Sequence, residues 1–166
     1  VIGRVTWIPD ALAAELGTPG KPLTAPDGFD AILLDDAPPA GAVGDRAVRF
    51  GGGGSVDPDG SVTLGTRFSG SGTLAFQWYA SSEQSHDYLI LLVNGAEAAR
   101  ISGTKDGWQT FTTNLLTVME HDVRWRYQKD GSGSSGQDCG WVDSVTWTQF
   151  TQNLTVENGS GGGVYA

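Results

Sequence analysis

The chain has 166 residues, 39% of them hydrophobic, with 25 Gly, six Trp, four Tyr and six Phe, which is typical of an all-β domain with tight turns rather than a helical bundle. The formal net charge of −9 argues against nucleic acid or an anionic membrane surface as a partner. The sequence also lacks an apolar run long enough to insert into a membrane.

The N-terminal region is expected to form one short helix and a connector. The stretch PDALAAELG offers Asp10 as an N-cap and Gly17 as a C-terminal stop. The Pro-rich stretch TPGKPLTAPDG that follows indicates a connector. We therefore assign residues 1–28 to an attachment or linker segment. The chain begins at Val1 without a signal peptide, so we expect it to be a piece of a longer protein.

Short strands with turns between them are expected from residue 29 onward. Leu74, Phe76 and Trp78 alternate with smaller or polar residues, and Asn94-Gly95 is typical of a type I′ hairpin turn. GGGGS at 51–55, between an expected strand and DPDGSVTLG, is expected to form a flexible hairpin loop. The expected strands are 29–34, 47–50, 73–79, 87–93, 98–102, 108–113, 121–128 and 141–150.

This pattern predicts an all-β fold, an antiparallel two-sheet β-sandwich or jelly roll, with one short N-terminal helix. The sandwich is expected over residues 29–150, and residues 151–166 form a Gly-rich tail. The lone Cys139 excludes an internal disulfide and a Cys-based zinc site, and we expect it to be a small buried hydrophobe.

Strands that alternate in direction bring the connections 80–86, 103–107 and 129–140 to one end of the sandwich. Carboxylates gathered there need a cation, Lys or Arg partners, or screening water. Oxygen ligands without Cys favour Ca²⁺, although the same residues also serve as turn and cap residues in Gly/Ser loops. The candidate metal ligands are Glu83, Asp87, Asp130, Asp138 and Asp143.

A glycan site needs an aromatic ring for the sugar face and polar groups for the hydroxyls. Trp78, Trp125 and Trp108 are expected to face the core, so other residues near the same loops are the better candidates. Arg124 and Arg126 line an outward strand face, where they are within reach of anionic sugars or, as is commoner for such residues, are simply solvated. The candidate ligand-binding residues are Tyr79, His86, Tyr88, Gln137, Asp138 and Trp141, and we expect Tyr79 and Asp138 to be dispensable for folding.

Catalytic machinery is sparse. His121 is expected to be a core residue, and the sequence contains no Gly-x-Ser-x-Gly, His-Glu-x-x-His or phosphate-loop motif. Glu83 and Asp87 imitate a glycosidase pair only if they face each other across a sugar cleft. We therefore do not expect an enzyme.

The segments FQWYASSEQSHDYLILLVNG, ISG…GWQTF and HDVRWRYQKDGSGSSGQDCGWVDSVTW resemble the concanavalin-like, MAM-like jelly-roll modules of bacterial surface and secreted proteins, over about residues 73–148. The resemblance implies a two-sheet sandwich used for adhesion or ligand binding, often with bound Ca²⁺ and without catalysis. It does not fix the ligand.

Together these observations favour a non-catalytic carbohydrate-binding or adhesion module that recognises cell-surface polysaccharide or glycan through its loops, with Ca²⁺ as the candidate cofactor. We expect it outside a bacterial cell or on a particle surface, without nucleic-acid binding or membrane insertion. The alternative is a structural or protein-binding spacer of a larger protein, including a phage-like or gene-transfer particle spike.

Overall fold

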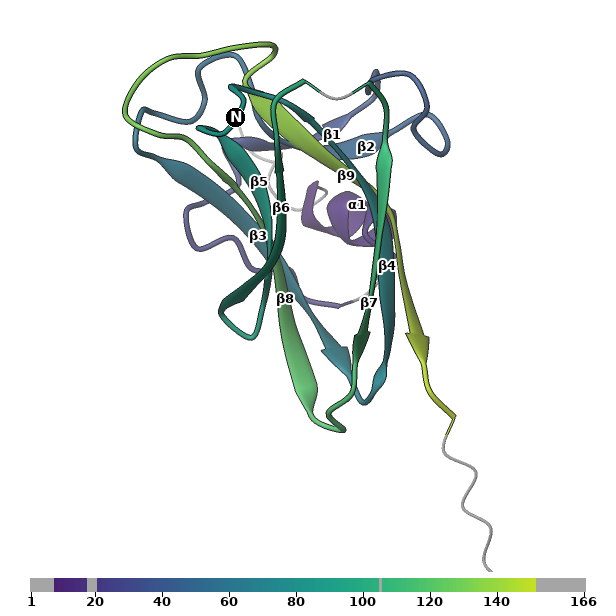
Figure 1. Ribbon diagram of the computed structural model, residues 1–166. Helices are drawn as coiled ribbons and strands as arrows, with labels where there is room; N and C mark the ends of the chain where they lie inside the picture. The colour runs from purple at the N-terminus through teal and green to yellow at the C-terminus, as the bar shows by residue number, and fades with distance from the viewer. Residues whose placement is uncertain (1–7, 18–20, 105, 152–166) are drawn as a thin grey trace, which may run out of the picture.

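The computed structural model describes residues 8–17, 21–104 and 106–151, and within them the chain forms one helix and nine strands (Figure 1). The predicted all-β class with one short N-terminal helix is confirmed. The elements are α1 (Ile8–Glu15), β1 (Ile32–Asp35), β2 (Ala47–Gly51), β3 (Ser61–Ser69), β4 (Gly72–Ser81), β5 (Tyr88–Val93), β6 (Ala96–Ser102), β7 (Gln109–Leu115), β8 (Glu120–Gln128) and β9 (Cys139–Gln149).

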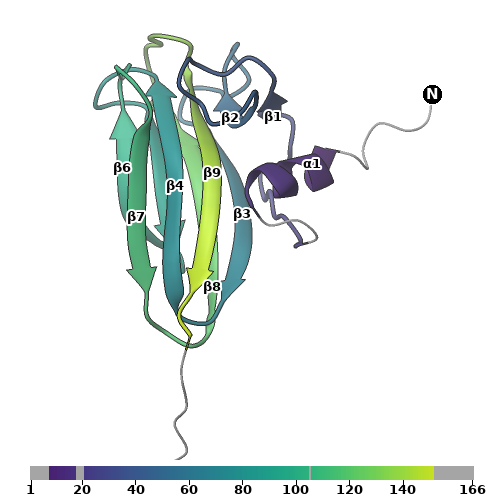
Figure 2. The ribbon, with the colours of Figure 1, turned by 90° about the vertical axis from the view of Figure 1, so that its right-hand side faces the viewer.

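The strands form two antiparallel sheets that pack face to face. The five-stranded sheet has the order β1-β2-β9-β4-β7, and the four-stranded sheet has the order β3-β8-β5-β6. Figure 2 shows β7, β4 and β9 of the five-stranded sheet side by side, with α1 at the flank of the sandwich. The predicted antiparallel two-sheet sandwich is therefore confirmed.

The core lies between the sheets and is built by strict alternation along the strands. Leu74, Phe76 and Trp78 of β4 are buried, as are Trp125 and Tyr127 of β8 from the opposite sheet. The rings of Phe76 and Trp125 meet edge to face with centroids 5.5 Å apart, which ties the two sheets together. Residues on the other face of each strand are thereby directed outward.

The structure adds a strand that was not among the expected ones. Strand β3 begins at Ser61 and pairs with β8 along its whole length. Gly65 interrupts the apolar pattern of this strand in the sequence. A glycine is needed there, because a side chain would collide with Arg124 and Thr24. Thr24 forms a two-way backbone bridge with Gly65 at 2.8 and 2.9 Å, so the connector covers the free edge of β3.

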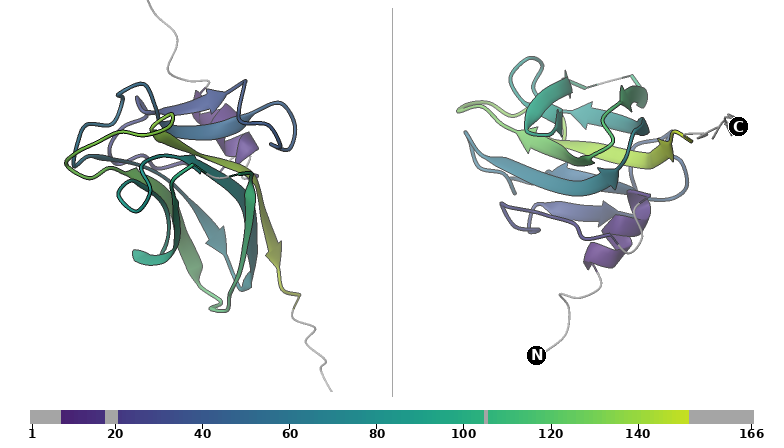
Figure 3. Two further views of the ribbon diagram at one scale, coloured as in Figure 1. Left: turned by 45° about the horizontal axis from the view of Figure 1, so that its top comes forward. Right: turned by 90° about the horizontal axis from the view of Figure 1, so that it is seen from below.

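The N-terminal helix differs in detail from its prediction. It begins at Ile8, so Asp10 lies inside it rather than at an N-cap. Leu12 and Leu16 are fully buried in the core cluster, and α1 contacts β1, β2 and β9 (Figure 3). Residues 1–7 and 152–166, most of the proposed C-terminal tail, lie outside the described residues. No helix in the described part is long and apolar enough to cross a membrane.

The chain crosses between the sheets at one end through four loops, which we call the rim: 52–60, 82–87, 103–108 and 129–138. The loops touch one another, since the backbone N–H of Gln137 donates to Ser81 Oγ (2.9 Å), that of Gly103 to Ser82 Oγ (3.1 Å), and that of Asp59 to the Asp130 carbonyl (2.8 Å). The predicted meeting of three loops is confirmed. Loop 52–60 is a fourth member of the rim. It was not predicted, because β3, the strand that follows it, was not predicted.

At the opposite end, Asn94 and Gly95 have φ values of 52° and 82°, which confirms the predicted type I′ turn between β5 and β6.

Candidate functional site

The base of the rim is a buried ion cluster centred on Lys129. The Lys129 side chain is 3% exposed, and its ammonium nitrogen lies 2.6 Å from Asp138 Oδ1 and 3.6 Å from Asp87 Oδ2. Asp87 has no exposed surface. Because Lys129 directly follows β8 and Asp87 directly precedes β5, two adjacent strands bring these charges together.

The cluster also organises its neighbours. Tyr127 donates its hydroxyl to Asp138 Oδ1 (3.0 Å), and burial together with the Asp138 charge raises the pKa of Tyr127. Asp87 Oδ1 accepts the backbone N–H of Asp130 at 3.0 Å. Desolvation acts to lower the pKa of Lys129, but the hydrogen bond and charge of Asp138, with Asp87, outweigh it and raise that pKa. Lys129 is therefore a fixed cation that joins two rim loops.

The predicted calcium ligands do not form one oxygen cage. Lys129 takes the position between Asp87 and Asp138 that a cation would need, which is the Lys-partner alternative of the sequence argument. Within the described residues, no group of three or more His, Cys, Asp or Glu side chains is arranged to hold a metal ion. These residues therefore do not fit a Ca²⁺ site, and calcium binding stays an untested prediction.

Two of the proposed ligands have other surroundings. Asp143 lies four residues into β9 from the rim, and its Oδ2 accepts the backbone N–H of Val43 at 2.6 Å. It thus fixes loop 36–46 instead of completing the rim cluster. Glu83 lies in loop 82–87, where its Oε2 is buried without a hydrogen-bond partner in the described part of the chain.

Above the ion cluster lies an exposed pair, His86 and Asp130. Their Nδ1 and Oδ2 atoms are 2.8 Å apart, and their side chains are 55% and 33% exposed. Asp130 Oδ1 accepts the backbone N–H of Ser132 (2.9 Å). This bond, with that of His86, lowers the pKa of Asp130. The pair is anchored from below, because the Asp130 backbone is bonded to Asp87.

The outer face of the four-stranded sheet continues from this pair. Tyr88 is half-buried on that face, and the Arg100 guanidinium lies 4.5 Å from its ring centroid. Gln128 stands opposite Tyr88 on the next strand. Arg126 lies two residues before Gln128 on β8, and its Nε donates to Thr63 Oγ1 (3.2 Å). We call this surface the Tyr88 patch, defined by His86, Tyr88, Arg100, Arg126, Gln128 and Asp130.

Other predicted ligand-binding residues lie on the outer face of the five-stranded sheet. Tyr79 packs between Trp108 and Trp141, with ring centroids 5.8 and 5.6 Å away. Trp141 is 1% exposed, and its indole N–H donates to Asp35 Oδ2 (2.8 Å). Loop 36–46 also contacts this cluster, since Trp108 donates to the Pro39 carbonyl (3.1 Å). These rings belong to a second small core, so the expectation that Trp108 faces the main core was wrong.

The remaining two candidates lie in loop 129–138. Gln137 is exposed and its backbone is bonded to Ser81, toward the five-stranded sheet. Asp138 is held by Lys129, so the expectation that it is dispensable for folding does not fit its place in the ion cluster. Of the predicted ligand-binding residues, the structure thus places only His86 and Tyr88 within the Tyr88 patch.

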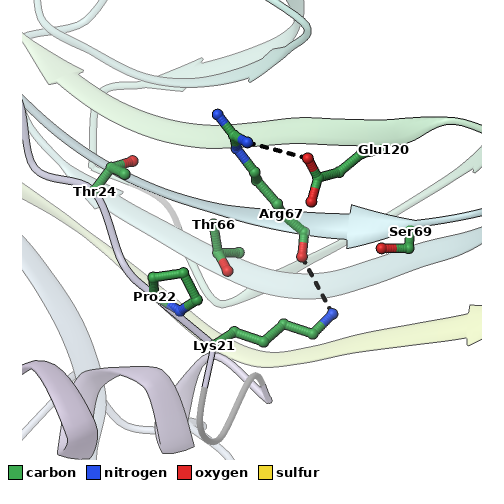
Figure 4. Close-up of a pocket in the computed structure, with 7 residues that line it drawn as sticks. All are labelled: Lys21, Pro22, Thr24, Thr66, Arg67, Ser69 and Glu120. Atoms are coloured by element: carbon green, nitrogen blue, oxygen red, sulfur yellow. Dashed lines mark hydrogen bonds and ion pairs between the residues drawn. The ribbon is translucent and has the colours of Figure 1, made fainter.

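A pocket of about 330 Å³ lies at the free edge of β3 (Figure 4). Lys21 Nζ donates to the Arg67 carbonyl (3.2 Å), and Arg67 pairs with Glu120 (3.1 Å) on its wall. The Thr66 hydroxyl is buried without a partner among the described residues. This pocket was not predicted, because β3 was not among the expected strands.

Arg100 and Gln128 were not among the predicted ligand-binding residues. The alternation of β8 places Gln128 on the face of Arg124 and Arg126, so that signal was available. Arg100 joins the patch only through the pairing of β6 with β5, which periodicity does not reveal.

Comparison with known proteins identifies structural neighbours only. No family model matches the chain. No curated protein matches it either. Among solved structures, the carbohydrate-binding module TmCBM61 in complex with β-1,4-galactotriose is similar with a TM-score of 0.51 and 15% identity, over 86% of this chain and 95% of that one.

Two further solved structures are similar. The K3 adhesin domain of Lys-gingipain from Porphyromonas gingivalis W83 gives a TM-score of 0.52 and 16% identity, over 78% of this chain and 91% of that chain. The secreted serine protease VesC from Vibrio cholerae gives 0.52 and 15%, over 75% of this chain but only 26% of that protein. At these identities the likeness shows the β-sandwich fold. A specifically concanavalin-like or MAM-like membership is not established by it.

Proposed function

We propose that the chain is a non-catalytic carbohydrate-binding or adhesion module that binds glycan on the Tyr88 patch. Presentation outside a bacterial cell, or on a particle that meets cells, is part of the proposal. The patch joins a half-buried aromatic ring to exposed imidazole, carboxylate, amide and guanidinium groups, which are the groups that hold sugar faces and hydroxyls.

The observation that carries this proposal is the support beneath the patch. Asp87 bonds the backbone of Asp130, Asp130 bonds His86, and Lys129 neutralises Asp87 from below. Polar groups held in this way lose little conformational entropy when a ligand binds. The Tyr79 cluster lacks this exposure, because Trp141 is 1% exposed and bonded to Asp35.

Two of the similar structures support the same reading. One is a carbohydrate-binding module described with an oligosaccharide, and the other is an adhesin domain. The VesC match also fits a secreted protein. Burial raises the pKa of the Cys139 thiol to about 12, so this thiol is a poor nucleophile.

The test is a glycan array probed with the wild type and with the double variant His86→Ala/Tyr88→Ala. We expect the wild type to bind at least one glycan class and the double variant to lose it. Tyr79→Ala is the matched control, because Tyr79 is also a half-buried tyrosine but lies on the opposite sheet. Binding by the double variant at the wild-type level would contradict the proposed site, and a wild type that binds no glycan would contradict the function.

One observation favours the alternative of a protein-binding spacer. Leu116, Val118 and Met119, in the loop between β7 and β8, are 73%, 72% and 74% exposed at the end opposite the rim. Exposed apolar residues that are neighbours mark docking surfaces for proteins. Replacing all three with Ser should leave glycan binding intact. If it abolishes attachment to cells while the patch variants retain attachment, the chain is a spacer.

A further inference from the structure

We infer that the glycan bound on the Tyr88 patch is acidic, with a carboxylate or sulfate group held by Arg126. This inference rests on the proposed function and specifies its ligand class. It depends on the arrangement of Arg126 and on the apolar strip beside it.

Arg126 is anchored and yet has unused donors. Its Nε donates to Thr63 Oγ1 (3.2 Å), and Thr63 is fully buried, so the guanidinium plane is fixed at its base. Within the described residues, no carboxylate lies within 4.0 Å of this guanidinium. The two terminal N–H₂ groups of the half-buried side chain therefore keep the fork that binds a carboxylate or sulfate with two hydrogen bonds.

The other arginines on this sheet face have partners that limit them. Arg124 Nη2 lies 2.7 Å from Asp122, and Arg67 Nη1 lies 3.1 Å from Glu120. Arg100 lies 3.3 Å from Glu97 and stacks on Tyr88. Arg126 is thus the arginine of this face whose charge remains uncompensated among the described residues.

An apolar strip runs between Arg126 and Arg100. Tyr88, Ile90 and Leu92 of β5 form it. Tyr88 and Leu92 are half-buried, whereas Ile90, which stands between Arg126 of β8 and Arg100 of β6 in the strand register, is only 6% exposed. The strip is about 13 Å long, because Tyr88 and Leu92 are four steps of about 3.3 Å apart along the strand. An acidic oligosaccharide fits this surface, because a sugar ring has an apolar face for the accessible parts of Tyr88 and Leu92 and an acid group at its edge for Arg126.

A nucleic acid offers phosphates to the same fork but fits the surroundings less well. Carboxylates of Asp122, Glu97 and Asp130 border the face, and the chain carries a net charge of −9. These carboxylates repel every polyanion, but in an acidic sugar the acid group is attached to the ring whose apolar face meets the strip, which a phosphate backbone does not provide.

The experiment measures dissociation constants by isothermal titration calorimetry. The probes are polygalacturonate, alginate and chondroitin sulfate, with carboxyl-reduced polygalacturonate, a neutral galactan and a single-stranded oligonucleotide as comparisons. The proteins are the wild type, Arg126→Gln, Arg126→Lys and the control Arg67→Gln, each shown to unfold cooperatively at the wild-type temperature. Arg67 lies on the same face but is paired and exposed.

We expect at least one acidic polymer to bind, and Arg126→Gln to weaken it by about 10-fold or more, the loss typical of a charge-assisted bidentate pair. Arg126→Lys should recover only part of the affinity, and Arg67→Gln should bind like the wild type. If the protein binds a neutral glycan and Arg126→Gln leaves that binding unchanged, this inference is overturned and the proposed function stands. Equal losses in both Gln variants, or preference for the oligonucleotide, would also overturn it. Binding to no glycan here or on the array would overturn both.

Discussion

Replacing Lys129 with Met should destabilise the fold far more than removal of any surface charge. The substitution keeps most of the side-chain volume but removes the ammonium group, which is 2.6 Å from Asp138 Oδ1 and 3.6 Å from Asp87 Oδ2. Asp87 has no exposed surface and would be left without its cation. Breaking a buried pair by removing one partner costs about 3–5 kcal/mol.

For a domain of this size, 1 kcal/mol corresponds to about 2–4 °C in melting temperature, so we expect Lys129→Met to melt about 6–20 °C lower. The control is Arg67→Gln, which breaks an ion pair whose side chains are 60% and 52% exposed. Such surface pairs are worth about 0–1 kcal/mol.

The assay is urea unfolding followed by tryptophan fluorescence, with calorimetry for the melting temperature. Equal m-values would show that the variants unfold from a comparable native state. If Lys129→Met lost no more stability than Arg67→Gln, the ion cluster would not organise the rim, and the argument for a rigid Tyr88 patch would lose its foundation.

Three further outcomes follow from the same residues. Because Lys129 occupies the space between Asp87 and Asp138, melting curves in millimolar Ca²⁺ and in EDTA should coincide, and a higher melting temperature in Ca²⁺ would confirm the predicted calcium binding. Because the pKa of Lys129 is raised in the folded state, its charge stabilises the fold fully below about pH 10.4, the unfolded value, and this contribution is lost as pH rises through the folded pKa. The unfolding free energies of the wild type and Lys129→Met should therefore converge at high pH. A difference that stays constant with pH would contradict this role of the Lys129 charge. The Cys139 thiol, with its pKa raised to about 12, should react with Ellman's reagent at pH 8 only after unfolding, so fast reaction of the native protein would contradict its burial.

The alternation of apolar residues was sufficient to predict the sandwich, because a strand with one buried face has a period of two. It placed Trp125 and Tyr127 in the core and the Asn94-Gly95 turn correctly. The alternation did not reveal β3, where Gly65 interrupts the pattern. The missing side chain of Gly65 allows Thr24 to approach the backbone closely. This strand is defined by its pairing with β8, a long-range contact that the local sequence pattern does not reveal.

The site was only partly predictable for the same reason. Strand direction alone brought the loops to one end, so the meeting of Asp87, Asp130 and Asp138 could be anticipated. Which face of which sheet each aromatic residue occupies depends on strand order. Tyr79 and Tyr88 looked alike in the sequence, yet they lie on outer faces of different sheets.

The central claim is that glycan binds on the outer face of the four-stranded sheet next to the rim. The most direct measurement is a ¹⁵N HSQC titration of the 17.4 kDa protein with the best glycan from the array. We expect the amide shifts to concentrate at residues 84–90, 100–102 and 126–130, with those around Tyr79, Trp108 and Trp141 unchanged. Shifts confined to the Tyr79 cluster, or to the pocket at the edge of β3, would contradict the claim.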